Sequence, residues 1–235
     1  MQNNETSFNL SRRQFGLQVA GLAGVAAFSG LTGCARRDGG TAYKKAFYSA
    51  HAVYGIDALG DMFEIFQRGG VIELAAAKKA YQIADAGLFA VDEIAALLER
   101  GLPANTFEKA RTFIASFKSA ISAGAIKFKS PKAESIYFNT VATVEVTINL
   151  IEAINAGRKK EVGELENQQK VAGVKAKAAV AQAQSETAWY QEAIVRGSTL
   201  ASELSILSNE EAPVIWEAVK NRSAATHAEN LRRGL

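Results

Sequence analysis

The chain has 235 residues and a formal charge of +3, with 27 lysines and arginines against 24 aspartates and glutamates. A nucleic-acid-binding surface needs a far more basic and clustered composition, so this balance argues against a nucleic-acid partner. Its single cysteine, Cys34, cannot form a disulfide within the chain, and its presence needs another explanation.

The first motif is basic. Ser11-Arg12-Arg13-Gln14-Phe15 is followed by an uncharged stretch, rich in glycine and alanine, that runs to Leu31. A basic start before an apolar middle is typical of a secretory signal. The segment resembles a twin-arginine export signal, with Arg12, Arg13 and Phe15 as its key residues. That resemblance implies a translocase that carries folded cargo, and therefore folding before export.

The apolar stretch ends in Leu31-Thr32-Gly33-Cys34, where small residues precede the cysteine. This sequence resembles the lipobox of bacterial lipoproteins, in which Leu31 and Gly33 precede the cleavage site and Cys34 is lipidated. Residues 1–33 are then the signal peptide, and residues 34–40 are a lipidated tether. An uncleaved membrane anchor is the alternative, but Phe15–Leu31 is shorter than the ~20 apolar residues that a span usually needs.

The same resemblance implies a place in the cell envelope, held to the membrane by lipid. Ala35 stands where an aspartate would suggest inner-membrane retention by resemblance to enteric lipoproteins. It therefore favours the periplasmic face of the outer membrane in a host with two membranes. Basic residues near an anionic leaflet could add ~1 kcal/mol each, although an ordinary solvated tether remains equally open. The membrane-proximal candidates are Arg36, Arg37, Lys44, Lys45, Arg158, Lys159 and Lys160.

Helical spacing of apolar residues predicts an all-α fold, with four helices between residues 41 and 157. Gly69-Gly70, Gly101 with Pro103, Ser130-Pro131 and Gly157 mark their ends. Short connections predict antiparallel neighbours, hence an up-down-up-down bundle. Within residues 136–154, which could be helix or strand, residues 144–150 alternate in a strand-like way, but no other segment offers a sheet partner, so we expect a helix there.

This topology predicts what lies at each end of the bundle. The start of the first helix and the end of the fourth share the end next to the lipid, together with residues 158–160. Lys127, Lys129 and Lys132 then lie at the far end, where a partner could bind.

From residue 158 the composition shifts to lysine, glutamine, glutamate and alanine, and residues 158–222 form an Ala-rich helical extension that ends in a short helix. A heptad seam of mostly small residues predicts close packing on the bundle, in a hairpin or on a second chain. It comprises Val162, Leu165, Gln169, Ala172, Ala176, Ala179, Ala183, Glu186, Tyr190, Ala193, Gly197, Leu200, Leu204 and Leu207. The polar tail, residues 223–235, is expected to fray.

Few residues suggest chemistry. His51 and His227 have no chelating residue three or four positions away, so we expect neither a metal site nor a cofactor. Acidic residues on the first two helices could act as paired carboxylates, but the same spacing more often gives a solvated face with ion pairs such as Glu64–Arg68. They are Asp57, Asp61, Glu64, Asp85, Asp92 and Glu93. Without a catalytic motif, we do not expect an enzyme.

Aromatic residues of the first helix could pack a core or line a pocket: Tyr43, Phe47, Tyr48, Tyr54, Phe63 and Phe66. Tyr48 and Phe63 fall off the main apolar stripe and would be exposed unless the C-terminal helices or another protein cover them. The sequence therefore predicts a lipid-anchored, non-catalytic helical module that binds a protein partner or forms a homo-oligomer. The alternatives are a periplasmic small-molecule or cofactor binder with an aromatic-lined core and, third, an envelope enzyme using the carboxylates.

Overall fold

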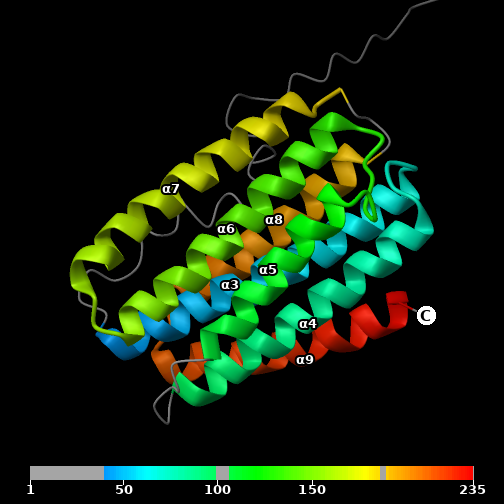
Figure 1. Ribbon diagram of the computed structural model, residues 1–235. Helices are drawn as coiled ribbons and strands as arrows, with labels where there is room; N and C mark the ends of the chain where they lie inside the picture. The colour runs from blue at the N-terminus through cyan, green and yellow to red at the C-terminus, as the bar shows by residue number, and fades with distance from the viewer. Residues whose placement is uncertain (1–39, 99–105, 186–188, 235) are drawn as a thin grey trace, which may run out of the picture.

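A computed structural model describes residues 40–98, 106–185 and 189–234 (Figure 1). These residues form seven α-helices and no strand, which confirms the predicted all-α fold. The helices are α3 (Thr41–Arg68), α4 (Leu74–Leu98), α5 (Thr106–Ser122), α6 (Pro131–Asn155), α7 (Lys159–Gln182), α8 (Tyr190–Leu207) and α9 (Ala212–Gly234). The ambiguous stretch 136–154 lies inside α6. None of these seven helices is long and apolar enough to cross a membrane.

Glycine and proline set the helix ends largely where the sequence predicts. After α3, Gly70 takes a φ of +70°, and the Val71 amide donates to the Phe66 carbonyl at 2.8 Å. Such a left-handed glycine closes a helix without steric cost. Ser130 caps α6 by accepting a hydrogen bond from the Ala133 amide at 3.3 Å. The predicted stop at Gly101 and Pro103 lies outside the described residues.

Successive helices run in opposite directions along the whole described chain (Figure 1). At one end, here called the near end, the start of α3 meets the end of α6, where Lys45 Nζ donates to Asn155 Oδ1 at 2.9 Å. The turn between α8 and α9 lies there too, because the Tyr43 hydroxyl donates to the Ser208 carbonyl at 2.7 Å. At the opposite far end the Lys129 amide bonds the Val71 carbonyl. The up-down-up-down order is therefore confirmed, and it continues to α9.

Helix α3 runs through the core. It packs against α4, α6, α8 and α9, and every residue from Ala46 to Gly60 is buried. Tyr48 and Phe63 are fully buried as well, so helices of the same chain supply the cover that their positions required. The Tyr48 hydroxyl donates to Glu166 of α7, and Phe63 packs among rings of α4, α5 and α6.

The described positions of the Ala-rich seam are buried or half-buried against the bundle itself, one of the three partners left open. Helix α7 packs on α6, and α8 packs on α3. Within this seam, Gln169 Nε2 donates to Thr147 Oγ1 of α6 at 2.8 Å. The seam positions of α8 from Tyr190 to Leu207 are all buried. Small side chains bury little area each, so they stabilise the pair by allowing a close approach.

The expected frayed tail is wrong for the described residues 223–234, which form the second half of α9. Ser223, Thr226 and Asn230 recur at helical spacing and are buried, because α9 packs on both α3 and α4. Gly60 permits the close approach, since a Cβ there would lie 3.0 Å from Asn230 Oδ1. Polarity suggested exposure, but the packing of α9 on α3 and α4 removes this stripe from solvent.

Candidate functional site

The acidic residues of α3 and α4 meet basic residues of α9 in what we call the ionic seam. Asp57, Asp61 and Glu64 follow one another at four- and three-residue spacing, which places them on one face of α3. Their partners come from the other end of the chain and face them across the α3–α9 contact. The seam comprises Asp57, Asp61 and Glu64 of α3, Asp85 of α4, and Arg222, His227 and Arg233 of α9.

Arg222 organises the first half of the seam. Its Nε and Nη2 atoms lie 2.7 Å and 2.5 Å from Oδ2 of Asp57, and its Nη1 lies 3.0 Å from Glu203 of α8. The guanidinium also sits 4.8 Å from the ring centroid of Tyr54. Burial raises the pKa of the Asp57 carboxyl, and the positive charge of Arg222 opposes that rise. One arginine thus joins α3, α8 and α9.

Arg233 organises the second half. Its Nη2 lies 2.6 Å from both Asp61 Oδ1 and Glu64 Oε2, and its Nε lies 3.2 Å from Glu229. Its side chain is only 5% exposed. The guanidinium lies 5.8 Å from the ring centroid of Tyr81, whose pKa is raised to about 12, mainly by burial. A buried charge with three acidic neighbours holds the last turns of α9 against α3.

Histidine completes the seam on the α4 side. His227 Nδ1 lies 2.6 Å from Asp85 Oδ1. Burial raises the pKa of the neighbouring Asp92 carboxyl, while the nearby Ser223 side chain opposes the rise. The side chain of Glu93 lies outside the described ones. Among the described residues, no three histidines, aspartates or glutamates are grouped so that they could hold a metal ion.

The seam differs from the two arrangements that the sequence suggested for its carboxylates. Asp57 and Asp61 each face an arginine, so they do not bracket a substrate-sized space as a pair of acids. They do not form a solvated face either, because α9 covers them, although Arg68 Nη2 does approach Glu64 Oε1 at 3.6 Å. The arrangement can position helices, and it leaves these carboxylates engaged with cations.

The basic half of the ionic seam is not evident from the local sequence. Arg222 and Arg233 lie 165 and 172 residues from their aspartate partners, and no local pattern links positions so far apart. A signal was present, since Ser223, Thr226 and Asn230 mark a helical stripe through the supposed tail.

The aromatic rings that could have lined a pocket pack on one another instead. The Phe63 centroid lies 4.9 Å from that of Tyr137 and 6.1 Å from that of Phe117. Phe66 packs edge-on against Trp189 at 4.9 Å. Offset and edge-to-face rings at such distances are typical of a filled core.

His51 lies inside this core. It is 1% exposed, and its Nδ1 lies 2.8 Å from the carbonyl oxygen of Phe47, to which it donates in the neutral ring. Burial lowers its pKa to about 4, because the charged imidazolium would lose its hydration there. His51 is therefore neutral at pH 7.

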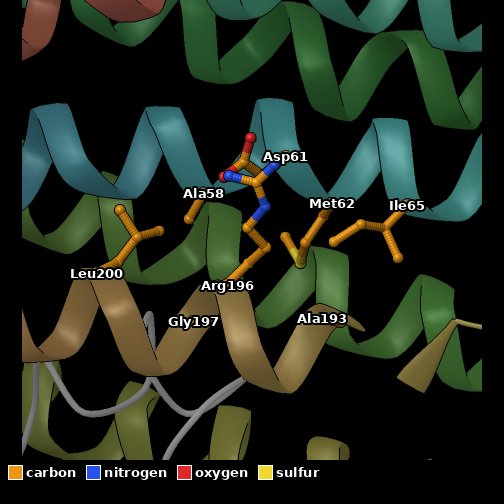
Figure 2. A pocket seen from close by; sticks show the side chains of 8 residues that line it. All are labelled: Ala58, Asp61, Met62, Ile65, Ala193, Arg196, Gly197 and Leu200. Carbon is orange, nitrogen blue, oxygen red and sulfur yellow. The ribbon is translucent and has the colours of Figure 1, made fainter. Parts of the chain in front are cut away.

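A small cavity lies between α3 and α8 (Figure 2). Its volume is about 10 Å³, which is close to the space of one water molecule. In Figure 2 the side chains of Asp61 and Arg196 point toward one another across it. Small residues of α8, Ala193 and Gly197, form its wall. This cavity is far smaller than a cofactor, and it separates two closely packed helices.

The near end carries mixed charge. Lys44 Nζ pairs with Glu166 at 3.2 Å, and Arg158 Nε pairs with Glu161 at 3.0 Å. Lys159 and Lys160 are exposed. The predicted membrane-proximal residues of the helices are thus brought together, but acidic neighbours offset part of their charge. The signal residues Arg12, Arg13, Phe15, Leu31 and Gly33, the lipidation candidate Cys34, and Arg36 and Arg37 lie outside the described residues.

Helix α7 presents an apolar face away from the bundle. It packs mainly on α6, receives side-chain contacts from α3 at Glu166, and is the outermost helix along one side (Figure 1). Val171 and Val174 on its outer face are 54% and 64% exposed. A groove of about 430 Å³ runs beside them, between α6 and α7. This face of α7 therefore combines exposed apolar side chains with a groove.

Comparison of the chain with protein-family models, with curated proteins and with solved structures found no match in any of the three.

Proposed function

We propose that this chain is a lipid-anchored protein of the cell envelope whose helical domain works by binding another protein, without catalysis. The observation that carries the binding role is the outer face of α7, which exposes Val171 and Val174 beside a groove. Apolar side chains gathered at a hollow are a feature of protein-binding surfaces. The ionic seam and the aromatic core, by contrast, are filled by contacts within the chain.

The proposed anchoring role rests on the export motifs and on the short length of chain between Cys34 and the start of α3. Seven residues lead from Cys34 to Thr41, where α3 begins, and a chain of that length spans at most about 25 Å. The near end would therefore stay close to the bilayer, with Lys159 and Lys160 exposed toward it. The far end would stand about 40 Å away, since α3 has 28 residues.

The test of anchoring is fractionation with lipid labelling. We expect the wild-type chain to pellet with membranes and to incorporate labelled palmitate, and a Cys34→Ser variant to lose both. Replacing Arg12 and Arg13 together by lysine should leave unprocessed chain in the cytoplasm. If the Cys34→Ser variant still pelleted and wild type took up no label, the anchor would be disproved.

We also propose the periplasmic face of the outer membrane as its location in a host with two membranes. Ala35 carries this proposal, so Ala35→Asp should move the protein to the inner-membrane fraction of a density gradient. An unchanged distribution would count against it. Ala35→Ser is the control, since it keeps a small neutral residue.

A further inference from the structure

A second heptad seam runs along the outer face of α7, opposite the one buried on α6. Its members are spaced four, three, four and three residues apart, and all are exposed: Asn167, Val171, Val174, Ala178 and Ala181. That spacing places them in one row along the helix. The row is apolar from Val171 onward, and no described helix covers it.

A groove beside this row could accept a helix. Asn139 and Ala142 of α6 form one wall, and Asn167, Val171 and Lys175 are among the residues of α7 that form the other. An amphipathic helix can lay its apolar side chains into such a groove, anchored at three- and four-residue spacing.

The charge beside the apolar part of the row, from Val171 onward, has one sign. Residues 167–182 contain Lys170, Lys175 and Lys177 and no acidic residue. Lys170 and Lys175 are exposed and flank the two valines, and neither forms an ion pair with a described residue. A partner must therefore bring negative charge to this face.

We propose that the α6–α7 face binds an acidic amphipathic helix of another protein, with small apolar side chains along its seam and glutamates or aspartates on either side. This inference rests on the binding role proposed above and names the class of partner. The valines supply the apolar contact, and the lysines select an acidic helix over a neutral or basic one.

Two other occupants fit less well. A second copy of this face would set lysine against lysine, because the positions flanking a heptad seam meet one another in both parallel and antiparallel pairs. A membrane would bury the amides of Asn139, Asn167 and Gln168 in acyl chains that offer them no hydrogen bond. A helical peptide can bond these amides.

The test uses the full chain, purified in detergent, and two fluorescent helical peptides. Both peptides carry the same leucine and alanine seam, flanked by glutamates in one and by lysines in the other. We expect the acidic peptide to bind at least about tenfold more tightly at low salt, by fluorescence anisotropy. The Lys170→Glu/Lys175→Glu variant should reverse that preference, which a merely structural role would not do.

Matched apolar variants locate the site. Val171→Asp/Val174→Asp should weaken acidic-peptide binding about tenfold, whereas Val195→Asp, on an exposed valine of α8, should not change it. Circular dichroism melting of each variant checks the fold. The proposal would be overturned if the two peptides bound equally well or if neither peptide bound. The proposal would also be overturned if the chain self-associated, or bound phosphatidylglycerol vesicles, and only the α7 variants abolished that association or binding.

Failure here can be told apart from failure of the proposed function. The peptide assay can be repeated on the Cys34→Ser chain, because this face involves no lipid. If the chain proves not to be lipidated but binds the peptide normally, the proposal of an acidic partner stands and the proposal of a lipid anchor fails. If the chain is labelled by palmitate but does not bind the acidic peptide selectively, the lipid anchor stands and the acidic partner fails.

Discussion

Helices α3 and α7 have similar lengths, 28 and 24 residues, but opposite relations to solvent. Large aromatic and aliphatic side chains surround α3, and four other helices cover it. A stripe of small residues attaches α7 to α6, and its other side is exposed. Buried apolar area stabilises a fold roughly in proportion to its size, so stability is concentrated around α3. The surface left for binding lies on α7.

The largest effect is expected from truncating the ring of Phe63. Phe63→Ala should lower the free energy of unfolding by about 3–5 kcal/mol, since it removes buried contacts with Tyr137 and Phe117 and leaves a cavity. Urea denaturation measures it. The control is Val174→Ala on α7, where an exposed side chain should cost less than about 0.5 kcal/mol. Similar losses for both would refute the contrast between the two helices.

The second largest difference is expected between two ion pairs, one that joins α3 to α9 and one that joins α3 to α7. Arg222→Met leaves the buried Asp57 carboxylate without its cation and should cost about 3 kcal/mol, whereas Lys44→Met, at the half-exposed pair with Glu166, should cost under about 1 kcal/mol. Adding Asp57→Leu to Arg222→Met should recover most of the loss, because no buried carboxylate is then left without its cation at this position. A double variant as unstable as Arg222→Met would show that the charge is not the cause.

The core histidine makes stability depend on pH. The pKa of His51 is about 4 in the folded chain and about 6.5 when unfolded, so only the unfolded state gains a proton as the pH falls below 6.5. The free energy of unfolding should drop by about 2 kcal/mol from pH 7 to pH 5 through this group. His51→Gln removes the titrating ring, so its stability should vary less over that interval. Identical pH slopes in wild type and variant would contradict this.

The smallest effect is expected in the seam of α7. Gln169→Met removes a buried amide whose partner Thr147 also donates to the Thr143 carbonyl, so no hydroxyl loses its acceptor. Stability should change by less than about 1 kcal/mol, in either direction. A loss above about 2 kcal/mol, by urea denaturation, would mean that the polar contact and not the small-residue packing holds α7.

Local chemistry determined much of the fold. Glycines 70 and 157 and the Ser130-Pro131 pair end or start helices through backbone preferences that neighbours do not alter. The heptad seam of residues 162–207 predicted which side of α7 and α8 is buried, because helical spacing fixes the side chains that share a face. The outer seam of α7 has the same spacing and was overlooked beside it.

Tertiary structure alone decided which surfaces of α3 are covered and what α9 contributes. Tyr48 and Asp57 lie on opposite sides of one helix, and a local pattern cannot say that other helices cover both. The pairing of Asp57 with Arg222 joins positions 165 residues apart and turns a polar tail into part of the core. Helix ends follow from short-range sterics and hydrogen bonds, whereas these contacts exist only once the whole chain has packed.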